Sequence, residues 1–414
     1  MSPVKVAIFV DLFPPSMGGG ATRAFQIAQS LATLGYDVTV ITGSYIYPRG
    51  KSLFILKWSY EKTSNINICR VPSINLPFKG LLNRLLNYLI CSIFMLITAP
   101  KIKGFNIIFS LGMHPFTDFS AYLVKLINPR SRLVVDFSDI FPINTIYGIV
   151  SNATNRILLK IADFVTVHND SMKKIFVYLY KPTKKIAILY NSIDTNNFIP
   201  RPEMRKEKKI LNNICARSLS NKIVVSYFGV FGSFQRLDNV LKVAAHLQDQ
   251  EKCEHIVFCM IGDGEKRPLL ESLASNLKNV CICKPVRREL IPIIAAESDV
   301  GLVPVVTTDL FLQYVISPQK ASEFLSCGVP ILAPKGSFIG NLISKWNAGY
   351  VVDFSNIEDI CKCLKNICQN PGELEIKSIN ARLLATSIFS TNALRRTLLQ
   401  LLIEIFKQII ENQK

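Results

Sequence analysis

The chain has 414 residues, of which 49% are hydrophobic and 19% charged, so it is long enough for two folded domains and too apolar to be disordered. Its formal net charge of +18 favours an anionic partner, such as a phosphorylated substrate or an anionic membrane surface. Nucleic acid is disfavoured, because the sequence has no zinc-finger spacing, no basic helix followed by heptads and no aromatic RNA-binding strand signature.

The first half of the chain alternates between strand and helix patterns. Residues 4–10 form a continuous apolar run, which is typical of a strand buried on both faces, and no signal peptide is expected before it. Apolar residues at helical spacing over 21–34 and a second strand at 37–42 complete a βαβ unit. Further strands are expected at 106–111, 132–137, 163–168 and 185–190.

Residues 81–99 form an apolar segment that carries no charge after Arg84. An uncharged run of about 15 residues is shorter than the roughly 20 that cross a bilayer, so it predicts a buried or interface helix. The alternative is a helix on a membrane surface, because Lys79, Arg84, Lys101 and Lys103 flank the segment and favour anionic lipid. We therefore expect a cytoplasmic protein, with peripheral contact at the inner face of the cytoplasmic membrane as the alternative.

The second half repeats the alternation after a basic, proline-containing stretch. Strands are expected at 223–228, 255–262, 280–283, 300–306, 329–333 and 350–352, with helices between them and a long amphipathic helix at 393–410. The prediction is an α/β protein with two Rossmann-like, doubly wound domains. Its parts are an N-terminal domain (1–200), a linker (201–222), a C-terminal domain (223–390) and a helix (391–414) that is able to pack back toward the N-terminal domain.

Eleven cysteines are dispersed along the chain without a C-x-x-C pair, and there are only four histidines. Cys281 and Cys283 alternate on an expected strand, while Cys361 and Cys363 fall in an expected helix. This dispersion predicts reduced, buried thiols and no metal site. No cofactor is expected.

Glycines follow the first strand and open the next helix. Gly18 and Gly19 would let the backbone approach a ligand closely, and a helix start favours anions. The spacing excludes a dinucleotide fingerprint and a Walker A loop, because it is neither G-x-G-x-x-G nor followed by Gly-Lys-Ser/Thr. The alternative interpretation is a flexible loop tip.

Strand ends of the second half gather similar residues. Gly229 and Gly232 open a loop that leads to Arg236, and Gly262 belongs to a Gly-Asp-Gly turn after the next strand. Val286 follows the third strand and precedes two arginines. Because the carboxyl ends of parallel strands meet at one edge of a sheet, this convergence predicts a ligand site.

The segment 316–330 is expected to form a loop, a short helix and a turn into a strand. Ser317 is able to cap the helix, Pro318 suits its first position, and Gly328 suits its end. The helix start is suited to a diphosphate. Glu323 is the unexplained carboxylate of this helix, and the ordinary alternatives are a pair with Lys320 or a solvated position.

Taken in order, these features resemble the glycosyltransferase family 4 group of GT-B enzymes, and most closely its bacterial surface-polysaccharide branch. The elements that carry the resemblance are 18–20, 139–142, 190–194 with Phe198, 229–232, 262–264 and the Glu323 helix ending Gly328-Val329-Pro330. The resemblance covers nearly the whole chain. It implies two Rossmann-like domains that face an active-site cleft, and a retaining, metal-independent transfer of a hexosyl or N-acetylhexosaminyl group from a nucleoside-diphosphate sugar.

The resemblance also implies roles for individual residues. Glu323 would hold the nucleotide ribose, Ile316 and Ser317 would face the diphosphate, and Arg236 and Lys320 would neutralise the departing nucleotide. Gly18, Gly19, Gly229, Gly232, Gly262 and Val286 complete the expected nucleotide-sugar site. The expected acceptor is a glycan or a lipid-linked oligosaccharide of polysaccharide biosynthesis, such as an O-antigen or capsule.

Three departures from the family pattern leave alternatives open. Val315 stands where the family has a first glutamate, and Val230 and Gln235 stand near its basic pair. The histidine of the catalytic region falls at Ser138, beside Asp139, and His114 is the candidate to replace it. The alternatives are therefore a nucleotide-sugar epimerase or hydrolase of the same fold, or a non-catalytic partner subunit that binds a nucleotide sugar.

Overall fold

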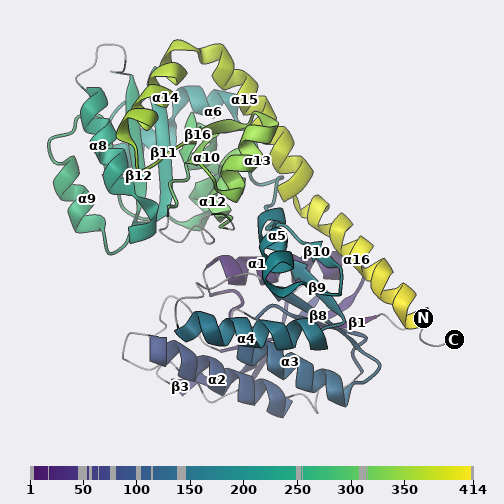
Figure 1. Cartoon of the computed structure of the whole chain (residues 1–414). Coiled ribbons are helices and arrows are strands. Elements are labelled where there is room, and N and C mark those ends of the chain that lie inside the picture. The colour runs from purple at the N-terminus through teal and green to yellow at the C-terminus, as the bar shows by residue number, and fades with distance from the viewer. Residues whose placement is uncertain are drawn as a thin grey trace. The chain divides into compact units, whose positions relative to one another are not determined.

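The computed structural model divides the chain into two compact units (Figure 1). The N-terminal unit is Met1–Asn191 together with Thr391–Lys414, and the C-terminal unit is Ser192–Ser390. The residues that the structure describes are 4–16, 18–44, 54–55, 58–63, 65–74, 81–98, 104–112, 115–137, 146–248, 253, 255–306, 314 and 316–411.

The N-terminal unit is built on an eight-stranded sheet in the order β10-β9-β8-β7-β1-β2-β5-β4. All neighbouring strands are parallel except β4 and β5, and β3 and β6 form a separate antiparallel pair. The strands are β1 (Lys5–Val10), β2 (Asp37–Gly43), β3 (Phe54–Ile55), β4 (Ser59–Thr63), β5 (Ile66–Val71), β6 (Ser73–Ile74), β7 (Ile107–Ser110), β8 (Arg132–Phe137), β9 (Phe164–Val167) and β10 (Ile186–Ile188).

Helices pack on both faces of this sheet. The described helices are α1 (Gly19–Thr33), α2 (Leu81–Thr98), α3 (Pro115–Ile127), α4 (Ile146–Ile161), α5 (Asp170–Tyr180) and α16 (Thr391–Glu411). Helix α3 packs between α2 and α4, whereas α16 packs against α1. The apolar segment predicted at 81–99 is thus a helix, and no helix among the described residues is both long and apolar enough to cross a membrane.

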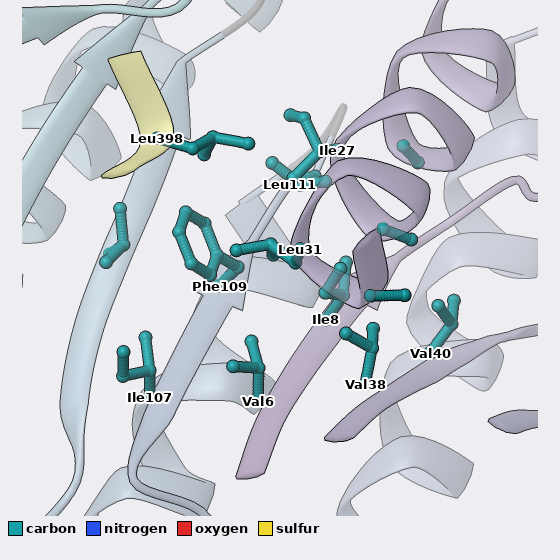
Figure 2. Close-up of a cluster of buried hydrophobic side chains, with 14 of the residues drawn as sticks. Val6, Ile8, Ile27, Leu31, Val38, Val40, Ile107, Phe109, Leu111 and Leu398 are labelled. Atoms are coloured by element: carbon teal, nitrogen blue, oxygen red, sulfur yellow. The ribbon is translucent and has the colours of Figure 1, made fainter. Parts of the chain in front are cut away.

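The core under α1 is completed by the last helix of the chain. Figure 2 shows Leu398 of α16 beside Phe109 of β7 and near Ile27 and Leu31 of α1. Leu398, Leu402 and Ile405 of α16 are completely buried. Residues 391–411 therefore belong to the N-terminal unit, although they follow the C-terminal unit in sequence.

The C-terminal unit has a six-stranded, fully parallel sheet in the order β13-β12-β11-β14-β15-β16. The strands are β11 (Ile223–Val230), β12 (Ile256–Asp263), β13 (Val280–Cys283), β14 (Val300–Leu302), β15 (Ile331–Pro334) and β16 (Gly349–Val352). Strand order reverses between β11 and β14. In doubly wound sheets this switch point is where the ligand crevice forms.

Two layers of helices cover this sheet. The helices are α6 (Pro202–Glu207), α7 (Lys209–Cys215), α8 (Leu237–Gln248), α9 (Arg267–Ala274), α10 (Ile291–Glu297), α12 (Gln319–Ser326), α13 (Phe338–Trp346), α14 (Ile357–Gln369) and α15 (Pro371–Leu384). Tyr227 joins the core under α8, and the neighbouring Phe228 contacts Phe324 of α12. Tyr227 and Phe228 lie on opposite faces of the sheet, because successive side chains of a strand alternate between the two faces.

Gly301 lets α12 lie close to the sheet. A Cβ atom at this position of β14 would come within 2.4 Å of the Phe324 ring. The ring instead packs with its centroid 4.4 Å from that of Phe228. A side chain at Gly301 would push α12 away from the switch point.

The predicted linker, residues 201–222, contains two helices that pack in the C-terminal unit. Helices α6 and α7 both lie against α10. The Glu297 carboxylate accepts hydrogen bonds from the Ile210 and Leu211 N–H groups at the start of α7, at 3.1 and 2.8 Å. Free N–H groups at a helix start attract such a carboxylate, and this pairing fixes the segment against its unit.

Arg205 attaches α6 to the same unit. Its Nη2 donates to the Cys327 and Gly328 carbonyls at 3.1 and 3.0 Å, beyond the end of α12. The basic segment predicted as a linker therefore includes an arginine that binds carbonyls at a helix end.

Candidate functional site

The carboxyl edge at the switch point of the C-terminal unit brings Gly229 and Lys320 together. Lys320, in the first turn of α12, holds its amine 3.7 Å from the centre of the Tyr227 ring, within the range of a cation–π contact. A Cβ atom at Gly229 would lie 3.2 Å from the Lys320 Nζ. Gly229 also has a φ of +134°, which favours glycine, so backbone conformation and lysine position both depend on this residue.

The neighbouring glycine turn packs tightly against this loop. Gly262 lies opposite Gly229 in the β11–β12 register, and a Cβ atom at Gly262 would approach the Gly229 carbonyl oxygen to 1.9 Å. The Phe231 N–H donates to the Asp263 carbonyl at 2.8 Å, and the Lys266 N–H donates to the Phe231 carbonyl at 3.0 Å. The glycine turns thus fix the two loop backbones against each other.

The surroundings of Lys320 change its proton affinity. Burial lowers the pKa of the Lys320 amine to about 7, while the charge of Glu323 acts in the opposite direction. An amine with this pKa is partly protonated at neutral pH. An anion beside it would favour the charged form, so ligand binding and proton uptake are coupled at this position.

Glu323 is buried in α12, with 2% of the residue exposed, so it is not a solvated surface residue. It forms an ion pair through Oε1 with Nη2 of Arg288, in the 3-10 turn Arg288–Leu290. The contact lacks hydrogen-bond geometry, and Oε1 has no hydrogen-bond partner among the described residues. A buried carboxylate oxygen with unused acceptor capacity is suited to ligand hydroxyls.

Arg288 was not among the predicted site residues. It stacks at 5.6 Å from the Phe198 ring centre, and its charge offsets that of Glu323. The sequence signal was the Arg-Arg pair after β13, but nothing in the linear pattern linked it to Glu323.

The start of α12 differs from the prediction. The helix begins at Gln319 with Pro318 as its cap residue, and no side chain caps it, so the predicted cap by Ser317 is wrong. Pro318 has the extended ψ of 132°, which moves the start by one residue. Ile316 and Ser317 precede this start as partly buried residues, and Gln319 donates through Nε2 to the Ser192 carbonyl at 2.9 Å.

The end of α12 agrees with the prediction. Gly328 has φ +64°, and its N–H donates to the Leu325 carbonyl while the Val329 N–H donates to the Phe324 carbonyl, each at 3.0 Å. This pair of bonds is a Schellman motif, which needs a left-handed residue where Gly328 stands.

Arg236 and Gly232 line a separate hollow of about 270 Å³ between the 3-10 turn Ser233–Gln235, α8 and α9. Arg236 has a left-handed φ of 41°, and its Nε lies 3.9 Å from the Asp238 Oδ1. The hollow's lining includes neither Lys320 nor Glu323. Val286 lies elsewhere on this edge, partly buried in the loop between β13 and the Arg288–Leu290 turn.

In the N-terminal unit, Gly18 and Gly19 open α1 as predicted. Gly18 is the cap residue with φ 122°, a conformation that favours glycine. A Cβ atom at either glycine would meet no atom of the described residues within 4 Å. The positions of His114, Ser138 and Asp139 lie outside the described residues.

The carboxyl edge of the N-terminal sheet also holds a buried ion pair that sequence reasoning missed. Arg23 of α1 donates through Nε and Nη2 to the two carboxylate oxygens of Asp136, both at 2.8 Å. Thr166 donates to Asp136 at 2.5 Å, and the Arg23 Nη1 donates to the Asn191 side-chain oxygen at 3.0 Å. Arg23 and Asp136 are 113 residues apart, so no local pattern indicates the pair.

Two further carboxylates lie at this edge. Asp11 accepts a hydrogen bond from Thr117, and Asp118 accepts one from Ser110 at 2.6 Å. Burial raises the pKa of Asp118 well above its usual range and nearby Asp11 adds to the effect, while the hydrogen bond from Ser110 opposes it. The described carboxylates of this edge are therefore satisfied by the unit's own side chains.

Comparison with protein families separates the same two halves. A family described as Glycosyltransferase Family 4 matches residues 17–197, and one described as Glycosyl transferases group 1 matches residues 216–383. The chain carries the two domains of a GT-B glycosyltransferase. The GT-B fold predicted from the sequence is confirmed.

Solved structures of glycosyltransferases share the fold. Sucrose-phosphate synthase from Thermosynechococcus elongatus is 14% identical over 98% of this chain and 100% of that chain, with a TM-score of 0.76. Anabaena HepE in complex with UDP-glucose is 14% identical over 97% and 99%, with a TM-score of 0.67. WaaG, a glycosyltransferase involved in lipopolysaccharide biosynthesis, is 16% identical over 92% and 97%, with a TM-score of 0.65. A search of curated proteins finds no match.

Proposed function

We propose that the protein is a retaining, metal-independent glycosyltransferase that uses a nucleoside-diphosphate sugar. It moves a hexosyl or N-acetylhexosaminyl group to a glycan or lipid-linked oligosaccharide in bacterial polysaccharide biosynthesis, for an O-antigen or capsule. The observation that carries the proposal is the Lys320 amine, held over Tyr227 and beside Gly229 at the switch point of a parallel sheet.

The chemistry of the donor explains the need for this amine. When the glycosidic bond to the donor phosphate breaks, negative charge develops on the diphosphate, and a fixed cation beside it stabilises the transition state. Lys320 supplies that cation, and the free N–H groups at the start of α12 add to the positive potential. Gly229 lets the diphosphate approach the loop backbone without a side chain in between.

Glu323 is assigned to the nucleotide ribose. A ribose presents two adjacent hydroxyls, and a carboxylate accepts hydrogen bonds from both. Glu323 Oε1 accepts no hydrogen bond among the described residues and provides such an acceptor, with the Arg288 guanidinium beside it as the counter-charge. The UDP and UDP-glucose bound to HepE support a uridine donor as the first to test.

The acceptor side of the proposal is supported by an apolar surface on the N-terminal unit. Leu89, Ile93 and Ile97 follow one another at four-residue spacing on α2 and are 39%, 47% and 51% exposed. Leu126 of the neighbouring α3 is 57% exposed. Such a surface, on a helix that basic residues flank in the sequence, suits peripheral docking on anionic lipid, where a lipid-linked acceptor resides.

This docking has a direct test in vesicle sedimentation. Ile93→Asp is expected to reduce binding to anionic vesicles, and Ile379→Asp, at an exposed isoleucine of the C-terminal unit, is the control. Equal sedimentation of both variants and the wild type would remove this part of the proposal.

The donor experiment begins with thermal stabilisation by UDP-, GDP- and dTDP-sugars, because a ligand of the folded state raises its stability. Transfer of label to a lipid-linked acceptor is then measured with the stabilising donor. Lys320→Met is expected to lose at least about 100-fold in transfer rate, which is the scale of one transition-state donor. Lys362→Met, at an exposed lysine of α14, is the control and should retain the wild-type rate.

The remaining results distinguish the alternatives. Turnover of free nucleotide sugar at full speed without acceptor or detergent would favour an epimerase or hydrolase. Nucleotide-sugar binding in calorimetry without transfer or turnover would favour a non-catalytic partner subunit that binds a nucleotide sugar, in line with the Val230 and Gln235 departures. A wild-type transfer rate in Lys320→Met would contradict the site assignment.

A further inference from the structure

Three thiols meet on one side of the C-terminal sheet, away from the switch point. They belong to Cys215 at the end of α7, Cys259 in β12 and Cys283 at the end of β13. The Cys215 Sγ lies 3.2 Å from the Cys259 Sγ and 4.0 Å from the Cys283 Sγ. All three sulfur atoms lie within 4.8 Å of one another.

Sheet register brings the thiols together. In the parallel β12–β13 pair, Cys259 lies opposite Cys281, and Cys283 is two residues further along, on the same face. Phe258 and Met260 point to the opposite face, where they join the core under α8. Helix α7, from the segment predicted as a linker, packs against β13 and adds Cys215.

A packing role alone does not explain this arrangement. A buried free cysteine commonly acts as a small apolar side chain, as Cys361 does in the core under α14. The cluster instead places three sulfur atoms from three elements within 4.8 Å of one another. Around a zinc ion with Zn–S bonds of about 2.3 Å, tetrahedral geometry sets sulfur atoms roughly 3.8 Å apart. The two separations from the Cys215 Sγ, 3.2 and 4.0 Å, lie on either side of that spacing.

Charge around the cluster suits bound thiolates. Arg217 lies two residues after Cys215 in the chain. The Arg217 Nη1 donates to the Lys278 carbonyl, whereas its Nε and Nη2 have no hydrogen-bond partner among the described residues. Three thiolates around a divalent cation leave one negative charge, which this guanidinium offsets.

We propose that Cys215, Cys259 and Cys283 bind one thiophilic divalent cation, with Zn²⁺ as the physiological choice. Each thiol gives up its proton to the solvent and forms one sulfur–metal bond. Because Cys215 is partly exposed, water reaches the fourth position of a tetrahedral ion. The ion links α7 to the sheet, at a place separate from Lys320 and Glu323.

The test uses the reduced, tag-free full chain and Co²⁺ as a spectroscopic probe of zinc sites. One equivalent of Co²⁺ is expected to produce sulfur-to-cobalt charge-transfer absorption, which Zn²⁺ then removes by displacement. Zn²⁺ alone should also raise the melting temperature of the protein. Cys215→Ser is expected to lose the absorption and the shift, whereas Cys363→Ser, at a partly buried cysteine of α14, should keep both.

Two results would overturn the proposal. One is the absence of thiolate–cobalt absorption in the wild type, or its unchanged presence in Cys215→Ser. The other is a Cys215–Cys259 disulfide in protein isolated under reducing conditions, because it would remove two of the three ligands. If Cys215→Ser fails to fold by circular dichroism, Cys283→Ala replaces it with the same expectation.

Discussion

The two units present similar sheet edges that are filled in different ways. At the edge of the N-terminal sheet, Arg23 binds both oxygens of Asp136, and Asp118 is bonded to Ser110. At the edge of the C-terminal sheet, the Lys320 amine lies over an aromatic ring, and Glu323 Oε1 is ion-paired with Arg288 but accepts no hydrogen bond among the described residues. The same Rossmann-like framework thus closes one edge with its own side chains and leaves hydrogen-bonding capacity for a ligand at the other.

The largest expected effect comes from removing the Arg23–Asp136 ion pair at the edge of the N-terminal sheet. Arg23→Met should lower the free energy of unfolding of the N-terminal unit by about 3–5 kcal/mol, because it leaves the Asp136 carboxylate buried without its partner. Trp58 and Trp346 are the two tryptophans, one in each unit. Urea unfolding of a Trp346→Phe background therefore reports on the N-terminal unit.

Arg396→Met, at an exposed arginine of α16, is the matched control and should change the unfolding midpoint little. Equal midpoints for Arg23→Met and Arg396→Met would show that the buried pair contributes no stability.

Ligand affinity at the edge of the C-terminal sheet should depend on pH through Lys320. Its pKa of about 7 means that the free protein loses the charge as pH rises, while a bound diphosphate requires it. Affinity for UDP should therefore fall by up to about tenfold per unit between pH 7 and 9. Calorimetry in buffers of different ionisation enthalpy measures the linked proton uptake. A flat profile in the wild type, or the same slope in Lys320→Met, would argue against this coupling.

A smaller effect is expected from Glu323, the other candidate residue at the edge of the C-terminal sheet. Glu323→Gln keeps the size of the side chain and removes its charge, so the preference for ribose over deoxyribose should decrease by about tenfold. The measurement is the ratio of dissociation constants for UDP and 2′-deoxy-UDP. The control is Glu375→Gln on α15. Gln319→Glu is unsuitable, because Gln319 donates a hydrogen bond to the Ser192 carbonyl. An unchanged ratio would separate Glu323 from the ribose.

The smallest expected effect concerns Asp118. Because its folded-state pKa is raised, its contribution to stability is fully present below the unfolded value of about 4 and is lost as pH rises toward the folded value. Relative to Asp118→Asn, the wild type should lose unfolding free energy above pH 4, by less than about 1.4 kcal/mol per unit. Parallel curves for the two proteins from pH 4 to 8 would refute a raised pKa.

Much of the fold was predictable because buried parallel strands leave continuous apolar runs, such as residues 4–10 and 255–262. The strands β3, β4, β5 and β6 were missed. In β4, Tyr60, Glu61, Lys62 and Thr63 are exposed on an edge strand, so the sequence shows no buried run there. The predicted 201–222 linker was misjudged because its charges bind specific partners, as Arg205 does at the end of α12.

The candidate site was predictable where local chemistry marks it. Glycines with positive φ and a carboxylate in an apolar helix are visible in the sequence, so Gly229 and Glu323 stood out. Pairings set by topology were not visible. Arg288 meets Glu323, and Arg23 meets Asp136, only after distant strands are placed side by side. The same reason hid the three thiols, which no short sequence spacing connects.

The position of α16 has a consequence for the order in which the chain acquires structure during synthesis. Residues 192–390 form a contiguous unit that emerges from the ribosome before α16, whereas the apolar face of α1 is completed only when Leu398 and Leu402 are available. Domains commonly fold in the order in which they are made. In this protein the C-terminal unit, although it is synthesised second, has all of its residues before the N-terminal unit does. The N-terminal sheet keeps part of its apolar surface uncovered until residues 391–411 have been synthesised.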